Sequence, residues 1–537
     1  MVGWSYLHLV LGFDAAVYTI HTWLDARQLR ALRRAHPPKE LAHLYPAPQD
    51  YASKQAYSLD SLCFGMARGA FDSALSAALL LSGFLPWSWN AVGHLLGGAH
   101  RPIAQAVLWT LLTSGLNATL GLPWSLARTF GLEARHGFNK TSPATFAMDA
   151  LKSLGLGLAL GPPLIAAVAF ILERAGPWVA LHLWAFLLAM SMVLMALYPS
   201  VIAPLFNSFT PLPQGQLRAP PETSGHSIGG KDLVLVTQPG GGLVHPFLPT
   251  RSTPTNKREE IEALAASLHF PLTKLFVIDG SKRSAHSNAY MYGFWRNKRI
   301  VLYDTLIEQS SVPQAGGWAE DRNTLAPTLK PIPAALSSAP HTQVVAVLAH
   351  ELGHWALGHT PRLLAAAQVQ ILGQLALFTA LRASPTLASS FGFDPVTSPP
   401  FIAFVLFQYL SGPLDEVRGG RGPGGKLWEW GKEGKLKTSR EPGARRLCES
   451  GALGCLNNYV TRRFEFQADA FGVAQGRAED LKAALLVLDK ENKSPPHTDP
   501  LYSAYHYSHP PLLERLRAID AAVARGGSCA AEAKKKE

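Results

Sequence analysis

Charged residues are scarce in this chain. Asp, Glu, Lys and Arg make up 16% of its 537 residues, against roughly 25% in soluble proteins. Nearly half of the chain, 47%, is hydrophobic, and the apolar residues are clumped into long runs with few charges between them. This combination predicts a protein that crosses a membrane several times.

Cysteine is also rare. The four cysteines, Cys63, Cys448, Cys455 and Cys529, are scattered and have no Cys-x-x-Cys spacing. They exclude a disulfide framework and a zinc finger, which suits exposure to the cytosol. The first apolar run is too interrupted for a signal peptide and has no obvious cleavage site, so we expect none. The net charge of +11 comes without a recognition motif for nucleic acid, so we expect no nucleic-acid partner.

Seven apolar runs are candidates for membrane spans, most of them within the roughly 17–25 residues that a crossing helix needs. They are 2–24, 61–87, 103–126, 153–172, 177–206, 363–381 and 399–413. The first is the weakest, because it contains Asp14 and two histidines.

Lys and Arg alternate between the loops. The loops after the first and third runs are rich in them, whereas the second has only Arg101 and the sixth, 384–398, has none. Since positive loops stay in the cytosol, the first and third loops are predicted there and the N-terminus on the far side. Seven spans then return the C-terminus to the cytosol, together with the long polar stretches.

The order of apolar and polar stretches predicts five regions. They are 1–206 with spans one to five, 207–361 as a cytosolic catalytic region, 362–416 with spans six and seven, 417–455 as a flexible insertion, and 456–537 as a cytosolic C-terminal region. Short strands are expected at 274–277 and 299–303. The stretches 214–257, 310–340 and 418–449 read as loops or insertions because of their composition.

The strongest local signal is His350-Glu351-Leu352-Gly353-His354. Two histidines four residues apart lie on one helix face, so both imidazoles can reach one metal ion. The glutamate between them can take a proton from the attacking water. The pattern is typical of zinc proteases.

A catalytic zinc needs a third protein ligand. His359 follows at a spacing that is wrong by one residue for the extended metzincin pattern, so we expect it at a helix end or on the surface. The segment Glu465-Phe-Gln-Ala-Asp469 is the better source, because its two carboxylates share one helix face. One can bind the metal while the other accepts the free N–H of a ligating histidine. This favours a gluzincin-like site.

A third cluster, His506-Tyr-Ser-His509-Pro510-Pro511, lies near the end of the chain. The two prolines fit the first turn of a helix, which would place His509 at its mouth. A histidine there could stabilise the oxyanion of a tetrahedral intermediate, although a plain capping role is equally compatible with the sequence.

With these motifs the chain resembles the type 1 CAAX prenyl proteases, which are integral-membrane zinc metalloproteases of the endoplasmic reticulum. The stretches that carry the resemblance follow in order over most of residues 1–520: His136-Gly-Phe-Asn139, Pro204-Leu-Phe-Asn-Ser-Phe-Thr-Pro-Leu212, Ser281-Lys-Arg-Ser-Ala-His-Ser-Asn-Ala-Tyr290, His350-Glu-Leu-Gly-His-Trp355, 462–471 and 509–515.

The resemblance implies a mainly α, polytopic membrane protein in which seven transmembrane helices enclose a chamber beside a small β element. It implies a substrate class, prenylated CAAX proteins or peptides, from which three C-terminal residues are removed. The implied site comprises zinc on His350, His354 and Glu465, with Glu351 as general base and Asp469 supporting a ligand. His509 and Arg515 would stabilise the transition state or the site around it. Asn288 would contact the substrate backbone, and its segment would lie as an edge strand.

Two other functions remain open on sequence grounds. One is a membrane quality-control zinc protease that needs no prenyl group. The other is a transporter or scaffold with a vestigial metal site. The terminal Lys534-Lys535-Lys536-Glu537 fits a dilysine retrieval signal, which agrees with the endoplasmic reticulum only if the C-terminus is cytosolic.

Overall fold

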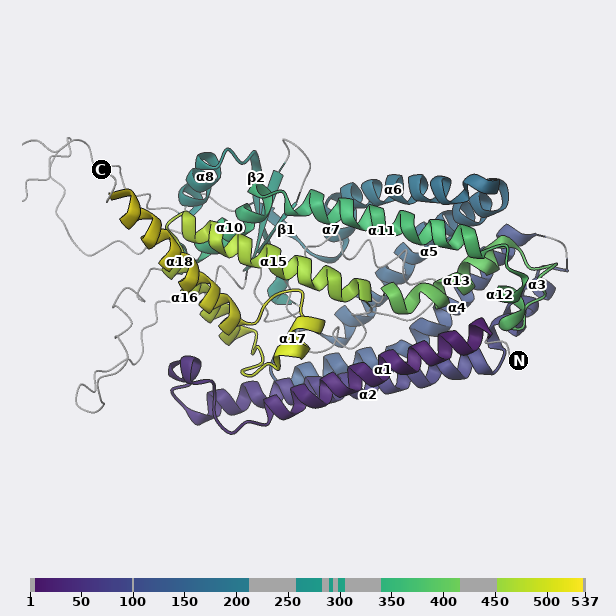
Figure 1. Cartoon of the computed structure of the whole chain (residues 1–537), viewed down its shortest axis with the longest axis horizontal. Helices are drawn as coiled ribbons and strands as arrows, with labels where there is room; N and C mark the ends of the chain where they lie inside the picture. The colour runs from purple at the N-terminus through teal and green to yellow at the C-terminus, as the bar shows by residue number, and fades with distance from the viewer. Residues whose placement is uncertain are drawn as a thin grey trace, which may run out of the picture.

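The structure is a computed structural model that describes residues 5–98, 101–211, 257–282, 289–292, 298–304, 340–415 and 452–534. Asn288 lies outside these residues, as does nearly all of the three stretches predicted to be loops or insertions. Helices dominate the described chain, and a single small sheet lies among them (Figure 1).

Long helices run along the major axis of the molecule (Figure 1). They are α1 (Tyr6–Leu32), α2 (Pro48–Leu81), α4 (Pro102–Leu126), α5 (Pro143–Arg174), α6 (Val179–Leu197), α11 (His359–Leu381) and α13 (Pro400–Asp415), with the shorter α3 (Phe84–Leu95) and α12 (Pro385–Ser390) at one end. Helices α1 and α2 pack together along one edge of the view, and α6 packs on α11 along the other.

Four of these segments are long and apolar enough to cross a membrane: Pro102–Glu133, Pro143–Arg174, Gly176–Phe206 and His359–Leu381. Helices α2 and α3, bent by 64° at their junction, make a fifth if they count as one span. In the most apolar stretch of each of these four segments, only 11–17% of the residues are buried inside the protein. Side chains such as Leu151 and Leu154 are 62% and 59% exposed, which water would penalise and lipid accepts. The protein is therefore embedded in a membrane.

The predicted count of seven spans is not confirmed. Among the described segments, helix α1 is not one of those apolar enough to cross a membrane. This agrees with the presence of Asp14 and Asp25 in its sequence. Helix α13 has 16 residues, or about 24 Å at the usual rise per residue, which is less than the roughly 30 Å of a bilayer core.

Aromatic side chains join several of the membrane helices. Trp109 of α4, Phe378 of α11 and Phe407 of α13 are fully buried in one hydrophobic cluster. Trp109 packs edge-on against Trp89 of α3 with ring centroids 5.7 Å apart, and its indole N–H donates to the Ser88 hydroxyl at 2.9 Å. Such rings bury a large area each and contribute strongly to packing.

The sheet has four strands in the order β1-β2-β4-β3. They are β1 (Phe209–Pro211), β2 (Leu272–Ile278), β3 (Ala289–Tyr292) and β4 (Lys298–Tyr303). Both strands predicted from the sequence are confirmed as β2 and β4, which pair in parallel. The segment that follows Asn288 forms the edge strand β3.

One face of the sheet supports the helix that carries the histidine motif. Ile300 and Leu302 of β4 cluster with Val345 and Leu348 of α10 (Pro340–Ala356), and all four side chains are fully buried. Because successive strand residues point to opposite faces, Val301 packs on the other side, against Ile278. The apolar run before His350 is thus the contact between α10 and the sheet.

The C-terminal helices complete the site region. They are α15 (Ala452–Ala474), α16 (Ala478–Glu491), α17 (Pro500–His506) and α18 (Leu512–Lys534). Helix α15 packs closely on α10, since a Cβ atom at Gly353 would lie 3.1 Å from the Phe471 side chain. The glycine of the histidine motif therefore permits the approach that brings Glu465 to the histidines.

The loops predicted on the cytosolic side all contact the C-terminal region. Lys54 pairs with Asp489 at 2.5 Å, Arg27 with Asp499 at 2.9 Å, and Lys493 donates to the backbone of His136 at 2.9 Å. At the other end, the start of α1 bonds to Ser390 of α12. The first loop, the third loop and the C-terminal region therefore share one end of the molecule.

Candidate metal centre

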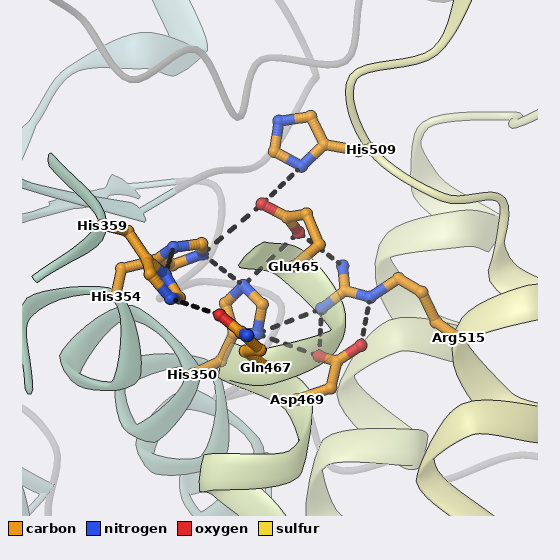
Figure 2. A network of polar contacts seen from close by, with 8 residues as sticks. All are labelled: His350, His354, His359, Glu465, Gln467, Asp469, His509 and Arg515. Atoms are coloured by element: carbon orange, nitrogen blue, oxygen red, sulfur yellow. Dashed lines mark hydrogen bonds and ion pairs between the residues drawn. The ribbon is translucent and has the colours of Figure 1, made fainter. Parts of the chain in front are cut away.

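Three side chains from two helices converge at one point (Figure 2). The ligand atoms of His350 and His354 on α10 and of Glu465 on α15 all lie within 4.8 Å of one another. The Nε2 atoms of the histidines are 3.3 Å apart. They lie 3.5 and 3.4 Å from the two carboxylate oxygens of Glu465. The structure thus brings together the three residues that the sequence proposed as ligands.

This group fits a divalent cation. All three side chains are buried, and Glu465 Oε2 accepts no hydrogen bond from the described residues. A buried carboxylate oxygen without a donor is costly unless a cation faces it. Burial opposes ionisation of Glu465, but His509 and the two motif histidines hold its pKa well below the ordinary value. Two imidazole nitrogens and one carboxylate oxygen are the donors of a catalytic zinc site.

Glu351 lies between the two histidines on α10 and is also buried. Burial raises its pKa, while the adjacent histidines oppose that rise. A carboxylate whose pKa is raised is a stronger acceptor of protons than one in water. Glu351 therefore lies beside the three converging side chains and has the raised proton affinity that a base needs.

Asp469 lies one helical turn beyond Glu465 and faces a different partner. Its Oδ1 is 2.9 Å from His350 Nδ1, and both its oxygens accept from Arg515, at 2.8 and 2.5 Å. Burial would raise the pKa of Asp469, but the Arg515 guanidinium overrides it and holds the pKa at about 2. The pair is thus a buried bidentate ion pair that fixes His350 by its second nitrogen.

His509 approaches from the chain that leads into α18. Its Nδ1 is 2.9 Å from Glu465 Oε1 (Figure 2), and its side chain is partly exposed. Helix α18 begins at Leu512, immediately after the two prolines, so the predicted helix start is displaced by only two residues. Arg462 of α15 holds this region by ion pairing with Glu514 and bonding Ser503.

His359 lies at a helix end, which is one of the two positions predicted for it. It begins α11, and its side chain is only 1% exposed, so the surface alternative does not hold. Gly358, with φ of 64°, turns the chain sharply between α10 and α11, a conformation that glycine adopts at little cost. His359 thereby returns to His354, with their Nδ1 atoms 2.9 Å apart. It is not one of the three converging ligands.

Gln467 is a second residue of the site that the sequence analysis missed. Its Oε1 lies 3.0 Å from His359 Nε2. Gln467 lies between Glu465 and Asp469 but not at the i, i+4 spacing that singles out these two residues. The one sequence feature that points to Gln467 is Phe464, three residues earlier, because residues three apart share a helix face.

Two family models match the chain. The first is described as the N-terminal part of CAAX prenyl proteases with five membrane helices and covers residues 28–208. The second is peptidase family M48 and covers residues 253–417 and 446–523. The second match includes all three converging residues together with Glu351, Asp469, His509 and Arg515.

Curated relatives match over nearly the full length. A CAAX prenyl protease 1 homolog of Arabidopsis thaliana is 40% identical over 96% of this chain and 97% of its own. A human CAAX prenyl protease 1 homolog is 34% identical over 95% and 94%. The crystal structure of S. mikatae Ste24p superposes with a TM-score of 0.73 at 26% identity, covering 96% of this chain and all of that one. The chain belongs to the CAAX prenyl protease 1 family of membrane metalloendopeptidases.

Proposed function

We propose that this protein removes the three C-terminal residues of prenylated CAAX proteins with a zinc ion held by His350, His354 and Glu465. The observation that carries the proposal is the convergence of these three buried side chains beside Glu351. When bound, zinc would polarise the scissile carbonyl as a Lewis acid. The names of the relatives supply the substrate class.

Glu351 acts as the general base and then as the general acid. Its carboxylate takes a proton from the attacking water and passes it to the amine nitrogen that leaves. Burial raises the pKa of Glu351, which favours the uptake of that proton. The position of Glu351 between His350 and His354 keeps it within one helical turn of both.

Three further residues support the reaction. Asp469 fixes His350 through its Nδ1, and Arg515 balances the charge of Asp469 in the buried site. Because the guanidinium of Arg515 is engaged by Asp469, its role is in the site around the ligands. His509 stands next to Glu465 and keeps a partly exposed edge, from which it can donate to the developing oxyanion.

The substrate would bind in extended form. The edge strand β3 has no strand beyond it among the described residues and packs near α10. An extended peptide can add to such an edge by backbone hydrogen bonds, with Asn288, which precedes β3, contacting the peptide. Substrate hydrolysis would take place at the cytosolic face of the endoplasmic reticulum, a location that the positive loops and the dilysine tail support.

Cleavage of paired peptides tests this function. Purified full-length protein is incubated with a farnesylated CAAX peptide and with its unprenylated twin, and the products are identified by mass. We expect loss of the last three residues from the farnesylated peptide alone. Equal cleavage of both peptides would favour a quality-control protease. Absence of cleavage from a chain that carries zinc would contradict a peptidase of this specificity.

A further inference from the structure

We propose that His359 and Gln467 form a hydrogen-bonded relay that fixes the tautomer and the ring orientation of His354 for metal binding. Both are positioning residues, since neither belongs to the three converging ligands and they act through the Nδ1 atom of His354; Figure 2 shows them beside His354. This inference rests on the proposed metal site.

The direction of the relay follows from its last member. A carbonyl oxygen only accepts hydrogen bonds, so the contact of 3.0 Å between Gln467 Oε1 and His359 Nε2 requires the hydrogen on Nε2. The Nδ1 of the neutral His359 ring is then an acceptor, and it accepts a hydrogen bond of 2.9 Å from His354 Nδ1. His354 Nε2 is left with its lone pair, which lies on the side of His350 and Glu465.

The opposite direction is incompatible with a ligand. If the amide of Gln467 were reversed, its N–H would donate to His359, and His359 would donate to His354 Nδ1. His354 would then carry its hydrogen on Nε2 and could not bind a cation. A relay that runs from His354 to Gln467 is the only one that serves metal binding.

The relay is held rigidly by α15. The ring of Phe464 stacks on His359 with centroids 4.1 Å apart and planes inclined by 3°. Phe464 and Gln467 are three residues apart and share one helix face, whereas Glu465 and Asp469 share another. One helix thus supplies the third ligand, the carboxylate behind His350 and the acceptor at the end of the relay behind His354.

The two histidine ligands are therefore supported differently. His350 donates to Asp469, whose negative charge Arg515 balances. His354 donates to a neutral imidazole that ends on a neutral amide. Partners of this kind orient ligating histidines, and their loss typically lowers metal affinity about 10–100-fold.

Zinc affinity of four variants tests the relay. Dissociation constants are measured by chelator competition on full-length protein in detergent. H359F keeps a ring to stack on Phe464 but has no acceptor, and we expect its affinity to fall about 10–100-fold. H359N places a carbonyl oxygen near the position of Nδ1 and should recover most of that loss. Q467L should weaken binding, whereas Q467E, which only accepts, should not.

Thermal unfolding of the metal-free variants controls for misfolding. If H359F does not fold, the comparison of zinc affinity between Q467L and Q467E tests the relay instead. Zinc binding by H359F and Q467L as tight as in wild type would overturn the relay. Equal loss in H359N and H359F would also overturn it, because the acceptor would then be irrelevant. A wild-type chain that binds no zinc would refute the proposed metal site itself, and the relay with it.

Discussion

Two carboxylates one turn apart on α15 have different surroundings. Glu465 Oε2 accepts no hydrogen bond from the described residues, whereas both oxygens of Asp469 accept hydrogen bonds from Arg515. The first can therefore offer its charge to a metal ion, and the second is already neutralised. The pKa of Asp469, about 2 instead of 3.8, means that its ionised form stabilises the fold above pH 3.8. That contribution is lost as the pH falls towards 2.

Asp469→Asn tests this division at the residue scale. The amide can still accept from His350, but it no longer balances the buried Arg515. We expect zinc affinity to fall about 10–100-fold in chelator competition. Asp520→Asn, on an exposed carboxylate of α18, is the matched control and should bind zinc as wild type does. Undiminished affinity in Asp469→Asn would show that the residue does not support His350.

Residue spacing predicted which side chains converge but not what surrounds them. The i, i+4 pairs at 350/354 and 465/469 follow from helix geometry alone, and they meet as expected. The burial of His359 depends on the turn at Gly358 and on the packing of α10 against α15. No periodicity encodes such a contact, so the sequence predicted the helix-end position of His359 as one of two alternatives but not its burial.

At the scale of elements, a buried ion pair connects an N-terminal helix with a C-terminal one. Lys54 of α2 and Asp489 of α16 form an ion pair at 2.5 Å with side chains only 7% and 6% exposed. They are separated by 435 residues in the chain. A buried pair of this kind fixes how two elements fit together, because either charge alone would be strongly unfavourable.

Lys54→Met or Asp489→Leu should each lower the free energy of unfolding by about 3–5 kcal/mol, since one buried charge then lacks its partner. The double substitution should recover most of the loss. The measurement is denaturant unfolding in mixed micelles. Arg517→Gln, which breaks the exposed pair with Glu40, is the control and should change little. Equal effects of the buried and exposed substitutions would contradict this account.

The elements themselves were partly predictable. Strands β2 and β4 followed from β-branched and aromatic residues, and the apolar runs predicted the membrane helices. The pairing of Lys54 was not predictable, because in the sequence it is one more positive charge of the first loop. Helix α13 is short in the structure, so that length alone does not establish it as a span.

At the scale of the whole molecule, different segments meet at the two ends of the helical layer. The first and third loops contact the C-terminal region at one end. Helix α12 and the start of α1 lie together at the other (Figure 1). The positive-inside rule predicts that the end with the first and third loops faces the cytosol.

Glycosylation tests the orientation. The native sequon at Asn139-Lys140-Thr141 lies in the third loop and should stay unmodified in cells, because it is predicted to face the cytosol. Pro395→Asn creates a sequon in the exposed segment between α12 and α13 and should be glycosylated. The readout is the mobility shift removed by endoglycosidase. A glycan on Asn139 would reverse the predicted orientation.

The central claim is that His350, His354 and Glu465 hold a catalytic zinc ion which Glu351 serves as base. Its most direct test measures zinc content and cleavage of a farnesylated CAAX peptide in parallel, for wild type and Glu351→Gln. We predict one zinc ion per chain in both, and a rate at least about 100-fold lower in the variant, within the range of general base catalysis. Cleavage by Glu351→Gln at the wild-type rate would contradict the claim.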